Sequence, residues 1–262
     1  MHPKLFSIGD FFLPTYGVLV AVAFLAALWL AGRLARRAGL NAEDVTNLGV
    51  YCALAGLAGA KLLMFVFDWD YYSSNPGEIF SLSTLRAGGV FHGGLIVALI
   101  TAAVYMRRKR LPGLKTADVF APALALGHAI GRLGCFAAGC CWGVACDRSW
   151  AVTFTDPEAH RLVGVPLNTP LYPTQLMESL SEAVIAVVLY GLIRKPHRDG
   201  LIIGMYLVLY GVVRFVVEFY RFHQQPNPWD GPFSSTQWIA LVLLLGGVFL
   251  AATRFRAPRE AS

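Results

Sequence analysis

The sequence is poor in charged residues. Asp, Glu, Lys and Arg make up 15% of its 262 residues, whereas hydrophobic residues make up 56%. An ordinary soluble domain has about a quarter of its residues charged, so this shortage excludes that class and indicates an integral membrane protein. The net charge of +6 is accompanied by no DNA- or RNA-binding pattern. Nucleic acid is therefore not an expected partner, and the lipid bilayer is.

The sequence also shows no signal for a cleaved leader peptide and none for a division into domains. No small-residue cleavage site follows the first apolar run, which is longer than the core of a signal peptide, so we expect this run to be retained. The chain has no internal repeat, low-complexity tract or second domain. A single membrane domain over residues 1–262 is therefore expected.

Long apolar segments dominate what is present. About 17–25 mostly apolar residues are needed for a helix to cross the bilayer. The sequence offers seven such segments, which predict an all-α polytopic fold with spans at about 14–32, 47–67, 89–106, 117–136, 175–193, 201–220 and 236–253.

The basic residues predict the orientation. Of the 22 Lys and Arg residues, 14 fall in segments 33–46, 107–116, 194–200 and 254–262, and five fall on the opposite side. Since basic loops stay in the cytoplasm, we expect the N-terminus outside and the C-terminus inside. The long polar segment 137–174 is then an outer loop, and the working face is the outer one.

The sixth predicted span carries three polar residues on one helix face. Tyr210, Arg214 and Glu218 recur at i, i+4 and i+8, a spacing that aligns side chains. Two interpretations remain open. Arg214 and Glu218 neutralise each other inside the membrane, or Glu218 orients Arg214 toward a ligand.

The fourth predicted span repeats the pattern with His128, Arg132 and Cys135 at i, i+4 and i+7. No carboxylate lies one turn from Arg132. Two interpretations stay open for its side chain: it extends toward the outer headgroups, or it binds a ligand. Arg132 and Arg214 lie roughly 20–22 Å above the inner surface at 1.5 Å per residue. Two guanidiniums at this depth suit phosphate binding.

Further polar residues open other spans at the same outer level. His92 begins the third span and is followed by Gly93 and Gly94, and Tyr16 begins the first. A histidine can accept a proton near neutral pH, although His92 can equally cap a helix. Tyr16 is either an interfacial anchor or part of a site.

Four of the five cysteines lie within twelve residues, in the pattern C-x4-C-C-x4-C. Zinc sites usually combine two distant pairs, so this spacing predicts no metal site. In an oxidising compartment a short disulfide is favoured. We expect Cys146 to pair with Cys140 or Cys141, and the spacing does not choose between them.

Taken together, these motifs resemble the prolipoprotein diacylglyceryl transferase family over nearly the whole chain. The matching motifs are His92-Gly93-Gly94-Leu95, Gly131-Arg132-x-Gly134-x-Phe136 with Trp142-Gly143, Pro173-Thr174-Gln175-Leu176, and Tyr210-Gly211-x-x-Arg214-Phe215-x-x-Glu218-x-x-Arg221. The resemblance implies an enzyme of the bacterial cytoplasmic membrane, acting at its outer leaflet without a cofactor. It implies transfer of diacylglyceryl from phosphatidylglycerol to the lipobox cysteine of a prolipoprotein, with release of glycerol 1-phosphate.

The resemblance also implies roles for individual residues. Arg132 is similar to the family's phosphatidylglycerol-binding arginine, and His92 and Arg214 are similar to its essential polar residues. His92 is the hypothesised base. The implied supporting and substrate-binding positions are Tyr16, Gly93, Gly94, Gly143, Gln175, Tyr210 and Glu218.

The cysteines depart from the family pattern. Many relatives carry asparagine in place of Cys135 and an acid in place of Cys140. A rival interpretation therefore stays open: a membrane thiol–disulfide exchange protein that uses Cys135, Cys140, Cys141 and Cys146. It leaves the arginines at one depth unexplained.

Overall fold

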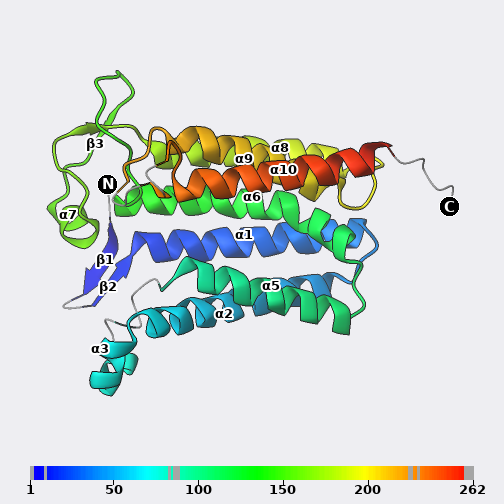
Figure 1. Ribbon diagram of the computed structural model, residues 1–262, viewed down its shortest axis with the longest axis horizontal. Helices are drawn as coiled ribbons and strands as arrows, with labels where there is room; N and C mark the ends of the chain where they lie inside the picture. The colour runs from blue at the N-terminus through cyan, green and yellow to red at the C-terminus, as the bar shows by residue number, and fades with distance from the viewer. Residues whose placement is uncertain are drawn as a thin grey trace. The chain divides into compact units, whose positions relative to one another are not determined.

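The computed structural model describes residues 3–8, 11–81, 84, 89–223, 227–228 and 231–256. These residues are mostly helical, with two short antiparallel strand pairs (Figure 1). The elements are β1 (Lys4–Ile8), β2 (Phe11–Pro14), α1 (Thr15–Arg37), α2 (Ala42–Phe67), α3 (Trp69–Ser74), the 3-10 helix η1 (Pro76–Phe80), α5 (Phe91–Arg108), α6 (Gly113–Ala138), β3 (Val152–Thr153), α7 (Pro157–Val163), β4 (Pro170–Leu171), α8 (Thr174–Ile193), α9 (Leu201–Glu218) and α10 (Ser235–Arg256).

Six helices of the described chain are long and apolar enough to cross a membrane: α1, α2, α6, α8, α9 and α10. The protein is therefore a multi-pass membrane protein. The seventh predicted span, 89–106, forms α5, in which His92, Arg107 and Arg108 reduce the apolar character. Seven spans and the orientation of the termini stay predictions.

The chain divides into two compact units, Met1–Leu34 with Ala117–Ser262, and Ala35–Thr116. In the first unit, α9 lies beside both α8 and α10 (Figure 1). Buried residues of α6, α8 and α9 form a core cluster that comprises Ala121, Ala125, Ile185, Ala186, Leu189 and Ile202. This packing fixes the three helices that carry the candidate site. The single domain expected over 1–262 stays a prediction.

A buried carboxylate caps the start of α9. Asp118 of α6 is 1% exposed, and its two oxygens accept hydrogen bonds from the backbone N–H groups of Gly200 at 2.7 Å and Ile203 at 2.8 Å. The first N–H groups of a helix lack partners within it, so Asp118 satisfies them. It thereby links α6 to α9 at the end away from the candidate site.

In the second unit, α2 and α5 pack at very short range. A Cβ on Gly93 would lie 2.5 Å from the carbonyl oxygen of Gly59, and one on Gly94 would lie 2.8 Å from that of Gly56. No real Cβ tolerates such distances, so both glycines of α5 are required for helix packing. The α2 helix begins five residues before the expected 47 because Asn41 caps it.

The predicted outer loop 137–174 is a folded element. It contains β3, α7 and β4, and its own core consists of Trp142, Phe154, Ala159, Val165 and Leu171. Its start returns across the end of α9, since Gly143 and Arg221 form an antiparallel bridge. This arrangement encloses the polar end of the helices.

Candidate functional site

Glu178 in the first turns of α8 lies at the centre of the candidate site. Its side chain is 3% exposed. One oxygen contacts Nε of Arg132 from α6, and the other contacts Nη1 of Arg214 from α9. Nη1 of Arg221 lies 3.7 Å from the latter oxygen. A single carboxylate thus gathers three guanidiniums from three parts of the chain.

A second carboxylate extends this network. The Oε2 atom of Glu218 lies 2.9 Å from Nη2 of Arg214. Its Oε1 atom accepts a hydrogen bond from the Ser234 hydroxyl at 3.0 Å and lies 2.9 Å from Nε2 of His223. The predicted alignment of Arg214 and Glu218 on one face is therefore confirmed. Glu218 pairs with Arg214 and also fixes its position.

The α6 face is confirmed as well. Nε of Arg132 donates to Nε2 of His128 at 3.1 Å, and Nη1 of Arg132 lies 4.0 Å from the sulfur of Cys135. Nδ1 of His128 lies 3.5 Å from the buried carboxylate of Glu182, and its ring faces that of Tyr210 with centroids 5.7 Å apart. Arg132, which has no carboxylate one turn away on α6, contacts Glu178 on α8.

More guanidiniums than carboxylates make direct ion-pair contacts at this point, while the third buried carboxylate, Glu182, contacts His128 and no arginine. Three guanidiniums surround two carboxylates, and none of the three arginine side chains is more than 19% exposed. Charges withdrawn from water require compensation. An anionic group of a ligand is the natural complement, and guanidinium bonds phosphate oxygens in a bidentate manner.

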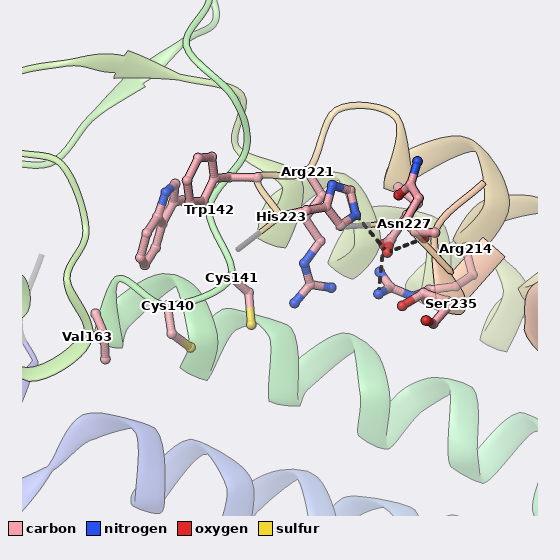
Figure 2. Close-up of a pocket in the computed structure, with 13 residues that line it drawn as sticks. Cys140, Cys141, Trp142, Val163, Arg214, Arg221, His223, Asn227 and Ser235 are labelled. Atoms are coloured by element: carbon pink, nitrogen blue, oxygen red, sulfur yellow. Dashed lines mark hydrogen bonds and ion pairs between the residues drawn. The ribbon is translucent and has the colours of Figure 1, made fainter. Parts of the chain in front are cut away.

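A cavity of about 420 Å³ opens beside this network (Figure 2). Figure 2 labels Arg214 and His223 at its wall, and both of these residues contact Glu218. Arg132 and Glu178 are not among the lining residues, but Glu178 contacts the lining residues Arg214 and Arg221. The lining consists of Cys140, Cys141, Trp142, Val163, Arg214, Glu218, Arg221, Phe222, His223, Asn227, Ser234, Ser235 and Thr236.

Backbone pairing explains how two distant segments line the same cavity. The N–H of Gly143 donates to the carbonyl of Tyr172 at 3.1 Å, and that of Val144 donates to the carbonyl of Tyr220 at 2.9 Å. A Cβ on Gly143 would lie 2.5 Å from the Tyr172 oxygen and 2.6 Å from the Tyr220 oxygen. Gly143, expected among the substrate-binding positions, is thus required for this three-segment junction, which holds Arg221 at the cavity.

The disulfide of Cys146 with Cys140 or Cys141 stays a prediction. All five cysteines are free thiols, and the sulfurs of Cys135, Cys140 and Cys141 lie within 4.8 Å of one another. Cys146 is outside that group because its N–H bonds the carbonyl of Pro170 at 3.1 Å, which holds it in the pairing with β4. The third thiol of the group is that of Cys135, near the end of α6.

Two residues of α8 fix the turn that carries these thiols. Nε2 of Gln175 donates to the carbonyl of Cys140 at 2.7 Å, and the Thr174 hydroxyl donates to that of Cys141 at 2.8 Å. Gln175 is 1% exposed. Its contact in the structure is therefore to the backbone of the turn, and the substrate-binding role implied by the resemblance stays a prediction.

The Cys141 thiol lies in an unusual environment. Its backbone is left-handed, with φ of 61°, a conformation that is uncommon for a residue with a side chain. Hydrogen bonds with the thiols of Cys135 and Cys140 lower the pKa of Cys141, and the charges of Arg221 and Arg132 act in the same direction.

The remaining expected residues lie in other surroundings. The ring of Tyr16, 44% exposed, lies against α6 at Gly134. His92 belongs to the second unit, where it is exposed. Gly93 and Gly94 pack against α2 there. A role of these residues in the site stays a prediction.

Sequence reasoning missed the central acid. Glu178 was not among the expected site residues, although Glu178 and Glu182 are one helical turn apart near the start of an apolar span. Intramembrane carboxylates mark functional sites by default, so this spacing was an available signal. His223, which follows the sixth predicted span, carried no comparable signal.

Comparison with known proteins gives consistent matches over the whole chain. A family model described as prolipoprotein diacylglyceryl transferase matches residues 3–253. Three relatives named phosphatidylglycerol--prolipoprotein diacylglyceryl transferase are similar to this chain. The Clostridium tetani protein is 32% identical over 95% of this chain and 96% of its own. The Sodalis glossinidius protein is 33% identical over 97% of this chain and 93% of its own. The Symbiobacterium thermophilum protein is 31% identical over 100% of this chain and 96% of its own.

Proposed function

The chain belongs to the prolipoprotein diacylglyceryl transferase family, and we propose that it transfers the diacylglyceryl group of phosphatidylglycerol to the lipobox cysteine of a prolipoprotein. The observation that carries this proposal is the group of three guanidiniums around Glu178, beside a cavity of about 420 Å³. An excess of guanidiniums over the carboxylates that they contact fits a phosphate ester.

The reaction is a displacement at the carbon of the diacylglyceryl group that is bonded to the phosphate oxygen. The C–O bond to phosphate breaks while a C–S bond to the substrate thiol forms. The thiol proton goes to a base, and glycerol 1-phosphate leaves with the electron pair of the broken bond. Negative charge grows on the phosphate in the transition state, so cations fixed there accelerate the step.

In this proposal Arg132 and Arg214 hold the phosphate, with Arg221 beside them. Glu178 and Glu218 position the guanidiniums before the lipid arrives, which avoids reorganisation during the reaction. The Tyr210 ring packs against His128, the hydrogen-bond partner of Arg132. The planar fork of arginine is the reason why lysine is a poor substitute.

We assign the base to His92. A free thiol has a pKa near 8.5 and is mostly protonated at neutral pH, and a positioned base contributes roughly 10²–10⁴-fold. Histidine suits that task because it exchanges a proton near neutral pH. Gly93, Gly94, Tyr16, Gly143 and Gln175 are proposed as supporting positions, and no cofactor is required.

The proposal places the reaction at the outer leaflet of the bacterial cytoplasmic membrane. The bias of Lys and Arg toward one set of loops supports an outer N-terminus and seven spans, with α5 as the third. The folded segment 137–174 then covers the site on the outside. The thiol–disulfide exchange interpretation receives no support from the relatives, which are named as transferases.

The decisive experiment incubates the purified full chain with phosphatidylglycerol and a peptide that contains a lipobox. The expected result is release of glycerol 1-phosphate together with a peptide mass increased by one diacylglyceryl group. A peptide with serine at the lipobox position is the control and should stay unmodified. Absence of both products from a folded, membrane-reconstituted protein would refute the proposed function.

A further inference from the structure

The three-thiol cluster is assigned no role in the proposed transfer reaction. Cys135 lies near the end of α6, Cys140 and Cys141 lie in the turn that follows, and their sulfurs are all within 4.8 Å of one another. Two of the three residues also line the cavity. Thiols that converge in this way form a set of soft ligands.

The spacing of the sulfurs suits one bound ion. Sulfurs bound to a common metal at about 2.3 Å lie about 4 Å apart in a trigonal or tetrahedral arrangement. The three sulfurs lie within 4.8 Å of one another, which is close to that separation. The C-x4-C-C spacing works here because Gly139 has φ of +79° and turns the chain back over the end of α6.

The backbone of the cluster is fixed before any ion binds. The N–H of Cys140 donates to the carbonyl of Cys135 at 3.1 Å. Gln175 and Thr174 bind the carbonyls of Cys140 and Cys141 from α8. A site held from a rigid helix loses little entropy when it binds.

The charges around the cluster favour thiolates. Nη1 of Arg132 lies 4.0 Å from the sulfur of Cys135. Figure 2 shows the Arg221 side chain extending into the same space as the sulfur of Cys141. Three thiolates around a monovalent ion carry two net negative charges, and Arg132 and Arg221, which also contact Glu178, reduce the cost of that charge.

We propose that Cys135, Cys140 and Cys141 form a trigonal site for one copper(I) ion. Thiolates are soft ligands and select copper(I), whereas structural zinc requires four ligands. Among the described residues, no fourth Cys, His, Asp or Glu joins the group. Each thiol that binds the ion releases its proton to water, so binding strengthens as pH rises.

The test is a titration of the full chain in detergent with copper(I), under reducing conditions and against a copper(I) chelator of known affinity. One ion per chain should bind, with ultraviolet absorption typical of copper–thiolate bonds. Cys135→Ser, Cys140→Ser and Cys141→Ser should each weaken binding by more than the roughly 10–100-fold that outer-shell changes cost. Cys146→Ser, which removes a thiol outside the cluster, should bind as the unmodified chain does.

A second measurement uses the unmodified chain and does not depend on how the variants fold. Bound copper(I) should protect Cys135, Cys140 and Cys141 from alkylation and leave the alkylation of Cys52 and Cys146 unchanged, as read by peptide mass spectrometry. Absence of binding would overturn the site. So would unchanged affinity in Cys135→Ser, tighter binding of zinc than of copper(I), or a pre-existing disulfide within the cluster. Transferase activity enters none of these readouts, so this inference and the proposed function fail separately.

Discussion

Arg132 and Arg214, on different helices, contact the two oxygens of one buried carboxylate. The carboxylate belongs to Glu178 on a third helix. A pair of arginines joined in this way keeps a fixed separation and orientation. This is the geometry needed to hold a phosphate ester whose charge increases during a reaction.

Glu178→Gln tests this relationship directly. The substitution keeps the shape of the side chain and removes the charge that three guanidiniums share. We expect the free energy of unfolding to fall by about 3–5 kcal/mol, the cost of breaking a buried ion pair, and transfer activity to fall with it. Thermal unfolding in detergent and kcat/KM measure the two effects. Glu182→Gln, one turn further along α8, is the matched comparison: Glu182 is equally buried but contacts His128 and no arginine, so this substitution should leave the arginines in place. Equal effects of the two substitutions would argue against a central role for Glu178.

Arg132→Lys keeps the charge and removes the planar fork. We expect kcat/KM to fall by about 10²–10³-fold, which is the usual cost of losing one fixed donor to a developing anion. Arg161→Lys serves as the control because Arg161 is 70% exposed on α7 and pairs with Glu158. Near-normal turnover of Arg132→Lys would remove Arg132 from phosphate binding.

His92→Asn addresses the proposed base. We expect activity to fall by roughly 10²–10⁴-fold, with the residual activity rising with pH as hydroxide and the free thiolate replace the lost base. The measurement is kcat/KM as a function of pH. His160→Asn is the matched control, since Nδ1 of His160 contacts the carbonyl of Val165 within the outer segment. An active His92→Asn variant with an unchanged pH profile would show that another group accepts the proton.

Gly143→Ala tests the junction that holds Arg221 at the cavity. The new methyl group would meet the carbonyl oxygens of Tyr172 and Tyr220 at 2.5 and 2.6 Å. The three chain segments of the junction must therefore move apart. We expect a loss of stability of about 1–3 kcal/mol, typical of overpacking, together with reduced activity. Gly191→Ala on α8 is the control because, apart from its chain neighbours and the nearby backbone of α8 itself, no atom lies within 4 Å of the added carbon. It should be neutral or stabilising, since alanine is favoured over glycine in a helix by roughly 0.5–1 kcal/mol. Wild-type stability of Gly143→Ala would mean that the junction yields easily.

Much of the helical framework was predictable from composition and apolar length. Six of the seven predicted spans are helices that qualify to cross a membrane, and the seventh is the less apolar α5. Helix ends were less predictable. For example, α2 begins at Ala42 because a single side chain, Asn41, caps it, and capping depends on local geometry more than on hydropathy.

The cysteines show what spacing alone leaves open. The spacing favours Cys146 as a disulfide partner, which stays a prediction, whereas in the structure the thiol that lies with those of Cys140 and Cys141 is that of Cys135. Backbone bonds to Pro170 hold Cys146 in a strand pairing, while a left-handed turn at Gly139 returns Cys140 and Cys141 to the end of α6. Neither constraint is visible in the sequence.

The sequence by itself determined which residues share a helix face. The i, i+4 spacing aligned Arg214 with Glu218 and His128 with Arg132, and both pairs are in contact. Helical periodicity fixes such relationships over two or three turns. Only the tertiary structure decided that Glu178 lies between the two arginines, because the rotation and depth of one helix against another depend on packing along their whole length.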